Sequence, residues 1–113
     1  MYPDSVFVSV HMNSFGDSKY SGLQVYYSTE NEESERIARG IQEQVKSDVQ
    51  NENNRKAKKG DGIYILENIS NPAVLVECGF LTNSDECKKL SEKEYQKQLS
   101  FSIVCGIINN IEN

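Results

Sequence analysis

The stretch from Asn71 to Asn83, NPAVLVECGFLTN, constrains the fold most, because an uninterrupted apolar run leads directly into a carboxylate. Val74, Leu75 and Val76 do not alternate with polar residues, which is typical of a strand that is buried on both faces. Glu77 follows at the expected end of this strand, where an ionised carboxylate is costly unless a cation, a metal ion or hydrogen-bond donors compensate it. Glu77 therefore needs a partner.

A second short apolar run, VFVSV at Val6 to Val10, ends on His11, the one histidine of the chain. In open α/β sheets, ligands bind beyond the carboxyl ends of parallel strands. If the two strands are neighbours, His11 and Glu77 form a candidate site at that edge. In the alternative interpretation both residues are structural, with Glu77 paired to a lysine and His11 hydrogen-bonded to a carbonyl. The strand pattern by itself leaves both open.

Apolar periodicity predicts strands that alternate with helices. The expected strands lie at residues 6–10, 22–28, 63–66 and 74–76. Three helices are expected, with starts marked by a capping box at Thr29 to Glu32, a cap at Asn83 and a capping box of Ser91 with Glu94. This order indicates an α/β fold with a mostly parallel sheet of about four strands and helices packed on it.

Only two of the expected helices are long. The first carries a stripe of Ile37, Ile41, Val45 and Val49, and the last a stripe of Tyr95, Leu99, Ile103 and Ile107 that Val104, Ile108 and Ile111 widen. Two long helices and one short helix cannot cover both faces of four strands. We therefore expect an uncovered edge or face, a domain that is incomplete at its N-terminus, and self-association.

The 13 residues from Gln50 to Gly62, QNENNRKAKKGDG, form a predicted loop that carries the one local basic patch. Its cations are Arg55, Lys56, Lys58 and Lys59. The patch could bind an anionic substrate, although most charge runs of this kind are solvated surface.

Composition excludes several classes of function. With 113 residues the chain has the length of one domain, and its net charge of -5 argues against nucleic acid as a partner. No apolar run approaches the roughly 18 residues of a transmembrane helix. Cys78, Cys87 and Cys105 form no CxxC pair, so they indicate neither a disulfide framework nor a cysteine zinc site, and we expect Cys78 and Cys105 to be buried.

Four segments together resemble a known family. They are VFVSVHMNS at 6–14, GLQVYYS at 22–28, NRKAKKGDGIYIL at 54–66 and PAVLVECGFLTN at 72–83. In order and spacing they are similar to the zinc-dependent N-acetylmuramoyl-L-alanine amidases, and most to the clostridial sporulation and germination enzymes that act on spore cortex. The resemblance covers essentially the whole chain.

The resemblance implies a hydrolase that cuts the amide between N-acetylmuramic acid and the L-alanine of the peptidoglycan stem peptide. In such enzymes two histidines and a glutamate hold one zinc ion. By resemblance His11 is the second zinc histidine, Glu77 the catalytic acid–base residue, and Asn13 a residue that shapes the pocket. The motifs that carry the family's other two zinc ligands do not occur here, so residues 1–113 are expected to be the C-terminal part of an incomplete three-layer amidase domain that is inactive alone.

The same resemblance implies an extracytoplasmic location, at the bacterial cell wall or spore cortex, and binding to peptidoglycan. Self-association or an activator protein is the further partner to be expected. One alternative is a truncated, non-catalytic amidase domain that only binds the wall or a partner. A second alternative is a different α/β hydrolase that uses Glu77 or a cysteine as nucleophile. It is weaker, because the chain has no Gly-x-Ser-x-Gly elbow and no base close in sequence.

Overall fold

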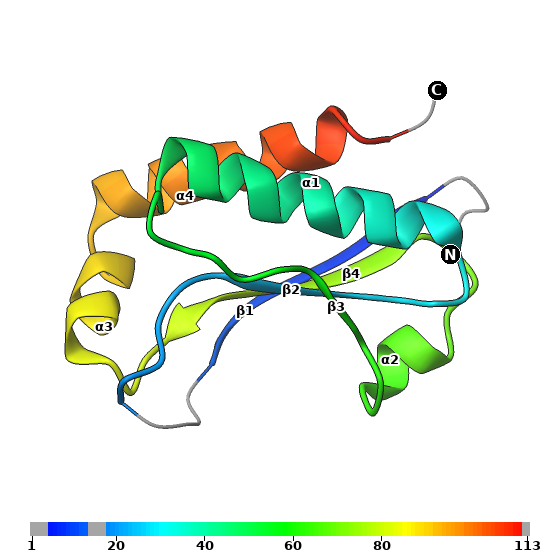
Figure 1. The fold of residues 1–113 in the computed structure, drawn as a ribbon, viewed down its shortest axis with the longest axis horizontal. Coiled ribbons are helices and arrows are strands. Elements are labelled where there is room, and N and C mark those ends of the chain that lie inside the picture. Colours follow the sequence, from blue (N-terminus) through cyan, green and yellow to red (C-terminus); the bar gives the residue numbers. More distant parts are fainter. Residues whose placement is uncertain (1–4, 14–17, 112–113) are drawn as a thin grey trace.

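A four-stranded sheet forms the centre of the structure, for which the computed structural model describes residues 5–13 and 18–111 (Figure 1). Its strands are β1 (Phe7–Asn13), β2 (Gln24–Tyr27), β3 (Lys58–Lys59) and β4 (Ala73–Phe80), in the spatial order β1-β4-β2-β3. β4 runs parallel to β1 and antiparallel to β2, and β2 runs parallel to β3. The sheet is mixed with two of its three pairings parallel, so the predicted α/β class is confirmed.

The helices are distributed unequally over the two faces of this sheet. The long helices α1 (Glu32–Asp48) and α4 (Lys93–Ile108) lie side by side over one face, whereas the single turn α2 (Tyr64–Glu67) lies on the opposite side (Figure 1). The short helix α3 (Ser84–Leu90) follows β4 and leads into α4. We call the side under α1 and α4 the helical face and the other side the open face.

Helix α1 forms where the apolar stripe was predicted, but it begins later than the predicted capping box. Ile37, Ile41 and Val45 are fully buried at 0% exposure each, because they point at the sheet and at α4. The helix is capped by Asn31, whose side-chain oxygen accepts a hydrogen bond from the Glu33 amide at 2.9 Å. The predicted cap at Thr29 is therefore wrong by two residues.

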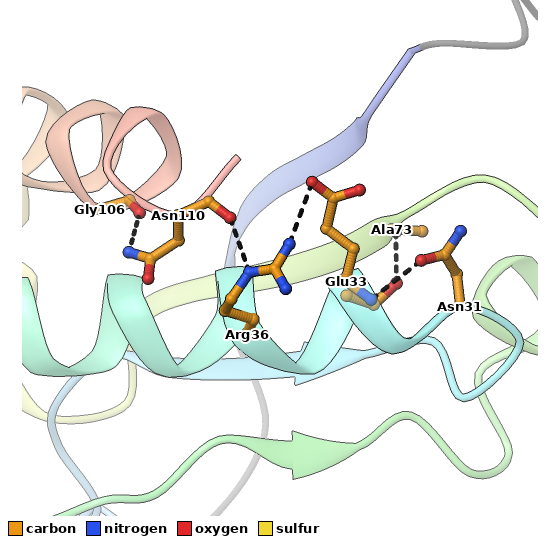
Figure 2. A network of polar contacts seen from close by, with 7 residues as sticks. Asn31, Glu33, Arg36, Ala73, Gly106 and Asn110 are labelled. Carbon is orange, nitrogen blue, oxygen red and sulfur yellow. Dashed lines mark hydrogen bonds and ion pairs between the residues drawn. The ribbon is translucent and has the colours of Figure 1, made fainter. Parts of the chain in front are cut away.

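The first turns of α1 are tied to other elements by polar contacts (Figure 2). The Ala73 amide of β4 donates to the Ser34 hydroxyl at 2.8 Å. Arg36 pairs with Glu33 at 3.4 Å and donates from Nε to the carbonyl of Asn110, just past α4, at 3.1 Å. These contacts fix α1 against both the sheet and α4.

The buried apolar stripe of helix α4 is narrower than the sequence predicted. Leu99 and Ile103 are buried, but Val104 is 49% exposed and Ile108 is 65% exposed, so they do not widen the inner stripe. The predicted capping box at Ser91 is also wrong, because Ser91 ends α3 and Glu92 occupies the N-cap position of α4 without a side-chain hydrogen bond. The predicted cap at Asn83 is confirmed, since its side chain accepts from the Glu86 amide at 3.1 Å.

Two segments between α1 and β4 differ from the prediction. Residues 63–66 were expected to form a strand, but Tyr64–Glu67 is the helix α2, and Tyr64 is 79% exposed. Within the predicted loop, Lys58 and Lys59 form β3 through backbone pairing with Tyr26 and Tyr27. The short apolar run IYIL was compatible with either conformation.

The expected uncovered edge is present at β1. Val6 and Val8 pack against the helical-face core, and by strand alternation Val10 and Met12 point to the same side. They are nevertheless 55% and 42% exposed, because the helices do not reach this end of the strand. Residues 14–17, which follow β1 in the sequence, lie outside the described residues. None of the helices described is long and apolar enough to cross a bilayer.

Candidate active site

His11 and Glu77 meet at the end of the β1–β4 pair, as the sequence predicted. The parallel register places His11 directly opposite Glu77, and their side chains approach to 3.2 Å between Nδ1 and Oε2. That distance suits an ion pair, yet Oε2 accepts no hydrogen bond from any described residue, so the imidazole N–H is not aligned with it. The structural alternative, in which Glu77 pairs with a lysine, is not what the described residues form.

The Glu77 carboxyl lies in a less hydrated position than His11. The side chain of Glu77 is 13% exposed and that of His11 is 45% exposed. Burial raises the pKa of Glu77 above its ordinary value, and the nearby His11 opposes this shift more weakly. The folded protein thus holds a proton on Glu77 to a higher pH than an exposed carboxyl group would, and a carboxyl group with such a raised pKa is a candidate for general acid–base catalysis.

A bulge in β4 directly follows Glu77 and decides which side chains share its face. His11 pairs with Glu77 and Asn13 pairs with Phe80, so two steps along β1 match three steps along β4. Without the extra residue Phe80 would point to the helical face, but the bulge turns it to the face of Glu77 and Asn13. Asn13 is thus beside the candidate pair, and its carbonyl accepts from the Leu81 amide at 2.8 Å.

Glu86 of α3 is a site-shaping residue that the sequence analysis missed. Its buried carboxylate accepts hydrogen bonds from the Gly22 amide at 2.8 and 3.0 Å and from the Phe80 amide at 2.7 Å. Any side chain at Gly79 would meet this carboxylate, since an added Cβ would lie 2.5 Å from Oε1. Glu86 therefore joins the start of β2 to the bulge that follows Glu77. The only sequence signal was its place three residues after the Asn83 cap.

Strand β2 and the segment that precedes β3 add further polar groups on the open face. Gln24 of β2 is the register partner of Glu77 and is 1% exposed, with Nε2 donating to the Lys56 carbonyl at 2.8 Å. Arg55 lies within 3.5 Å of the Gln24 Oε1 atom and stacks over the Phe80 ring. Arg55 belongs to the basic patch singled out in the sequence, and it contacts Gln24 and Phe80 on this face.

A hollow of about 740 Å³ adjoins this region but does not contain the candidate pair. It is lined by residues 49–55 together with Ser21, Gly22, Glu86 and Lys89. Neither His11 nor Glu77 lines it. The arrangement of catalytic residue types, and not the size of a hollow, therefore places the candidate site at the strand ends.

Cys78, the neighbour of Glu77 in the sequence, is poorly suited to act as a nucleophile. Cys78 is buried on the helical face, and burial raises the pKa of its thiol to about 11, so almost no thiolate exists at neutral pH. Cys105 is only partly buried and Cys87 is exposed, which confirms the prediction for Cys78 and corrects it for Cys105. A cysteine nucleophile at Cys78 is therefore disfavoured.

The described residues do not by themselves complete a metal site. Among residues 5–13 and 18–111 no three His, Cys, Asp or Glu side chains are grouped so that they could hold a metal ion. His11 and Glu77 offer one imidazole and one carboxylate at 3.2 Å. Both are ligand types that zinc accepts, but a zinc site needs three protein ligands.

Comparisons with known proteins agree on one family. Residues 2–109 match the family described as N-acetylmuramoyl-L-alanine amidase. The chain is 36% identical over 103 residues to the germination-specific N-acetylmuramoyl-L-alanine amidase of Bacillus subtilis, in an alignment that covers 91% of this chain and 43% of that protein.

Solved structures of similar proteins share the fold. The CwlD amidase from Clostridioides difficile, solved in complex with the GerS lipoprotein, has a TM-score of 0.87 and 42% identity over 93% of this chain and 53% of its own. The N-acetylmuramoyl-L-alanine amidase from Clostridium difficile 630 has a TM-score of 0.82 and 30% identity over 92% and 56%. The chain thus spans about half the length of the relatives it matches.

Proposed function

The chain belongs to the N-acetylmuramoyl-L-alanine amidase family, and from that membership we propose that it supplies the His11–Glu77 part of a peptidoglycan amidase active site. The proposed reaction is hydrolysis of the amide between N-acetylmuramic acid and the L-alanine of the stem peptide. The observation that carries the proposal is the pair itself. A buried carboxylate oxygen without a hydrogen-bond donor stands 3.2 Å from the imidazole of the neighbouring strand.

An orphaned buried carboxylate lowers stability, so it calls for a ligand or a reaction that uses it. A domain that only bound the cell wall would have no use for Glu77 in this position. This supports the catalytic function over the non-catalytic alternative.

We propose that His11 is one ligand of a zinc ion and that the other ligands come from outside the described residues. The donor types fit, since neutral imidazole is a common zinc ligand and the orphaned Glu77 oxygen faces it. A zinc ion held there would polarise the scissile carbonyl and make water more acidic. The exposed position of His11 at the end of edge strand β1 leaves room for the remaining ligands.

The proposed role of Glu77 is to move a proton. Its carboxylate would accept a proton from the attacking water and pass it to the amide nitrogen that leaves as the new amino terminus of L-alanine. Burial, which raises the pKa of this carboxyl, makes the carboxylate a stronger base and so favours the first half of that transfer, uptake of the proton from water. Asn13, on the same face, would contribute to the shape of the pocket.

The proposed place of action is outside the cytoplasm, at the cell wall or the spore cortex, where peptidoglycan is the substrate. The similar CwlD amidase was solved in complex with a lipoprotein. We propose that this chain likewise binds a partner protein, which could act as an activator.

The test is a pair of substitutions in a protein that carries a complete set of zinc ligands. Glu77→Gln should keep zinc and fold but lose amidase activity by about 10² to 10⁴, the effect usual for removal of a general acid–base group. His11→Ala should lose both zinc and activity. Glu94→Gln, which alters an exposed carboxylate of α4, is the matched control and should change neither. The measurements are zinc content and the release of L-alanine amino termini from purified peptidoglycan.

If Glu77→Gln cleaved at the parental rate, Glu77 would be a structural carboxylate.

The proposal that His11 is a zinc ligand has its own test, which is elemental analysis of the present chain. We expect weak zinc binding or none, since the described residues supply too few ligands. A tightly held, stoichiometric zinc ion with three ligands from this one chain would overturn that proposal.

A further inference from the structure

Arg55 differs from the other arginines of the chain in having no carboxylate partner among the described residues. Arg36 pairs with Glu33 at 3.4 Å, and Arg39 pairs with Glu35 at 2.7 Å, both within α1. Arg55 instead follows the polar run after α1 and is partly buried. An arginine that is held in place without an acidic partner can bind an acidic ligand.

The Arg55 guanidinium is held by three contacts that fix its plane. Nε donates to the Ser21 carbonyl at 3.0 Å, and Nη1 lies 3.5 Å from the Gln24 Oε1 atom. Its central carbon lies 5.1 Å from the centroid of the Phe80 ring, a distance suited to a cation–π contact. Stacking of this kind restricts the side chain before any ligand arrives, which lowers the entropy cost of binding.

The β2–β4 and β1–β4 strand pairings independently place the residues that contact this guanidinium on the open face, beside Glu77. Gln24 lies directly opposite Glu77 in the β2–β4 pairing, so their side chains share a face. Phe80 is turned to the same face by the bulge that pairs it with Asn13. The strands of Gln24 and Glu77 are neighbours, about 4.8 Å apart. Arg55 therefore stands roughly one to two strand spacings from the proposed reaction centre.

The Arg55 guanidinium also has N–H donors that are available to a ligand. Arginine carries five N–H donors, and the contacts above use two of them, so three have no acceptor among the described residues. Arg55 lines the hollow of about 740 Å³, which gives a ligand access. Two carboxylates also line that hollow. Glu86 is occupied by the amides of Gly22 and Phe80, and the exposed Glu52 forms no ion pair with Arg55 among the described residues.

We propose that Arg55 binds a free carboxylate on the peptide side of the scissile amide and so selects acidic stem peptides. The inference rests on the proposed function, because it takes Glu77 as the point where the amide is cut. One to two strand spacings correspond to about one to three residues of extended peptide, so the recognised carboxylate lies just beyond the L-alanine. A planar guanidinium can hold a carboxylate through two parallel hydrogen bonds, which an amide cannot reproduce.

The experiment compares two probes on the chain by calorimetric or NMR titration. They are N-acetylmuramoyl-L-alanyl-glutamate and the same compound with its carboxylates converted to amides. We expect the parent to bind the acid roughly 10 to 100 times more tightly than the amide, as charge-assisted hydrogen bonds allow. Arg55→Gln should bind both equally, and Arg55→Lys should show a reduced preference.

Arg39→Gln is the matched control, since it removes the same charge from α1 on the helical face, and it should keep the parental preference. Loss of packing on Phe80 in an Arg55 variant would weaken both probes together, so the ratio of affinities isolates the charge contact. The proposal is overturned if the parent binds acid and amide equally, if it binds neither at millimolar concentration, or if Arg55→Gln keeps the preference.

This outcome is separate from that of the amidase assay. An acid preference that depends on Arg55 would stand even if no hydrolysis were found with complete zinc ligands. Hydrolysis without any acid preference would refute the role of Arg55 and leave the proposed function intact.

Discussion

The two faces of the sheet are built from the same strands and yet have opposite properties. Under α1 and α4 the helical face is a continuous apolar core. The open face has only a small apolar cluster of Leu66, Ile69, Ala73 and Leu75, beneath the single turn of α2. Toward the carboxyl end of β1 this face carries polar and charged side chains, which include His11, Gln24, Arg55 and Glu77.

The difference shows how a small domain can hold an unfavourable carboxylate. Burial of apolar area provides most of the stability of a fold, and here most of it lies on one side of β4. The open face is then free to keep Glu77 in a position that would be too costly in a smaller structure. The residues that stabilise the fold therefore lie on one face of β4, and the candidate catalytic residue lies on the other face.

The largest effect expected from this comparison concerns unfolding. Ile41→Ala should lower the free energy of unfolding by about 2 to 5 kcal/mol, because Ile41 is fully buried between α1, α4 and the sheet. Ile65→Ala, on α2, should cost less than about 1 kcal/mol, since Ile65 is 41% exposed. Urea unfolding followed by circular dichroism measures both. Equal losses for the two variants would break the distinction between the faces.

A smaller effect is expected where the two long helices touch. A Cβ at Gly106 of α4 would lie 2.7 Å from the Ile41 Cα atom, so the backbones would have to separate. Alanine gains about 1 kcal/mol of helix propensity over glycine. The overlap should outweigh this gain, and Gly106→Ala should destabilise the fold by about 1 to 3 kcal/mol. Ser100→Ala on the exposed side of α4 is the control and should be neutral or slightly stabilising. A stabilised Gly106→Ala variant would show that the helices are not in close contact.

Much of this arrangement could be predicted from the sequence, because it depends on strong local signals. The unbroken apolar run at Val74 to Val76 predicted a strand buried on both faces, and all three residues are buried. The predicted neighbouring strand placed His11 beside Glu77, since parallel strands end at one edge. The uncovered edge followed from the number of long helices, and Val10 is indeed exposed there.

The parts that could not be predicted depend on contacts between distant residues or on backbone pairing alone. β3 consists of two exposed lysines, and no side-chain pattern marks it. The bulge after Glu77 depends on the pairing of β4 with β1. The Gly22 amide donates to Glu86, which lies 64 residues further along the chain. Arg55 could be seen only as one of four cations in a loop, because its position on Phe80 requires the folded sheet.

The smallest effect tests the open face itself, in the metal-free chain. The pKa of Glu77 is raised in the folded state, mainly by burial, so the folded protein holds this proton more tightly than the unfolded chain does. Stability therefore falls as the pH rises from the ordinary carboxyl pKa through the raised one, and the loss persists at neutral pH.

Glu77→Gln removes the titrating group at nearly constant shape. The variant should melt at a higher temperature than the parent at pH 7, and the difference should disappear at acidic pH, where Glu77 is protonated in both states. Thermal melts across this pH range in the presence of a chelator give the measurement, with the exposed Glu94→Gln as the control that should shift little. A lower melting temperature for Glu77→Gln at pH 7 would mean that the contact with His11 outweighs the cost of burial, and that Glu77 stabilises the open face. The open face would then contribute to the stability of the fold as well as to the candidate active site.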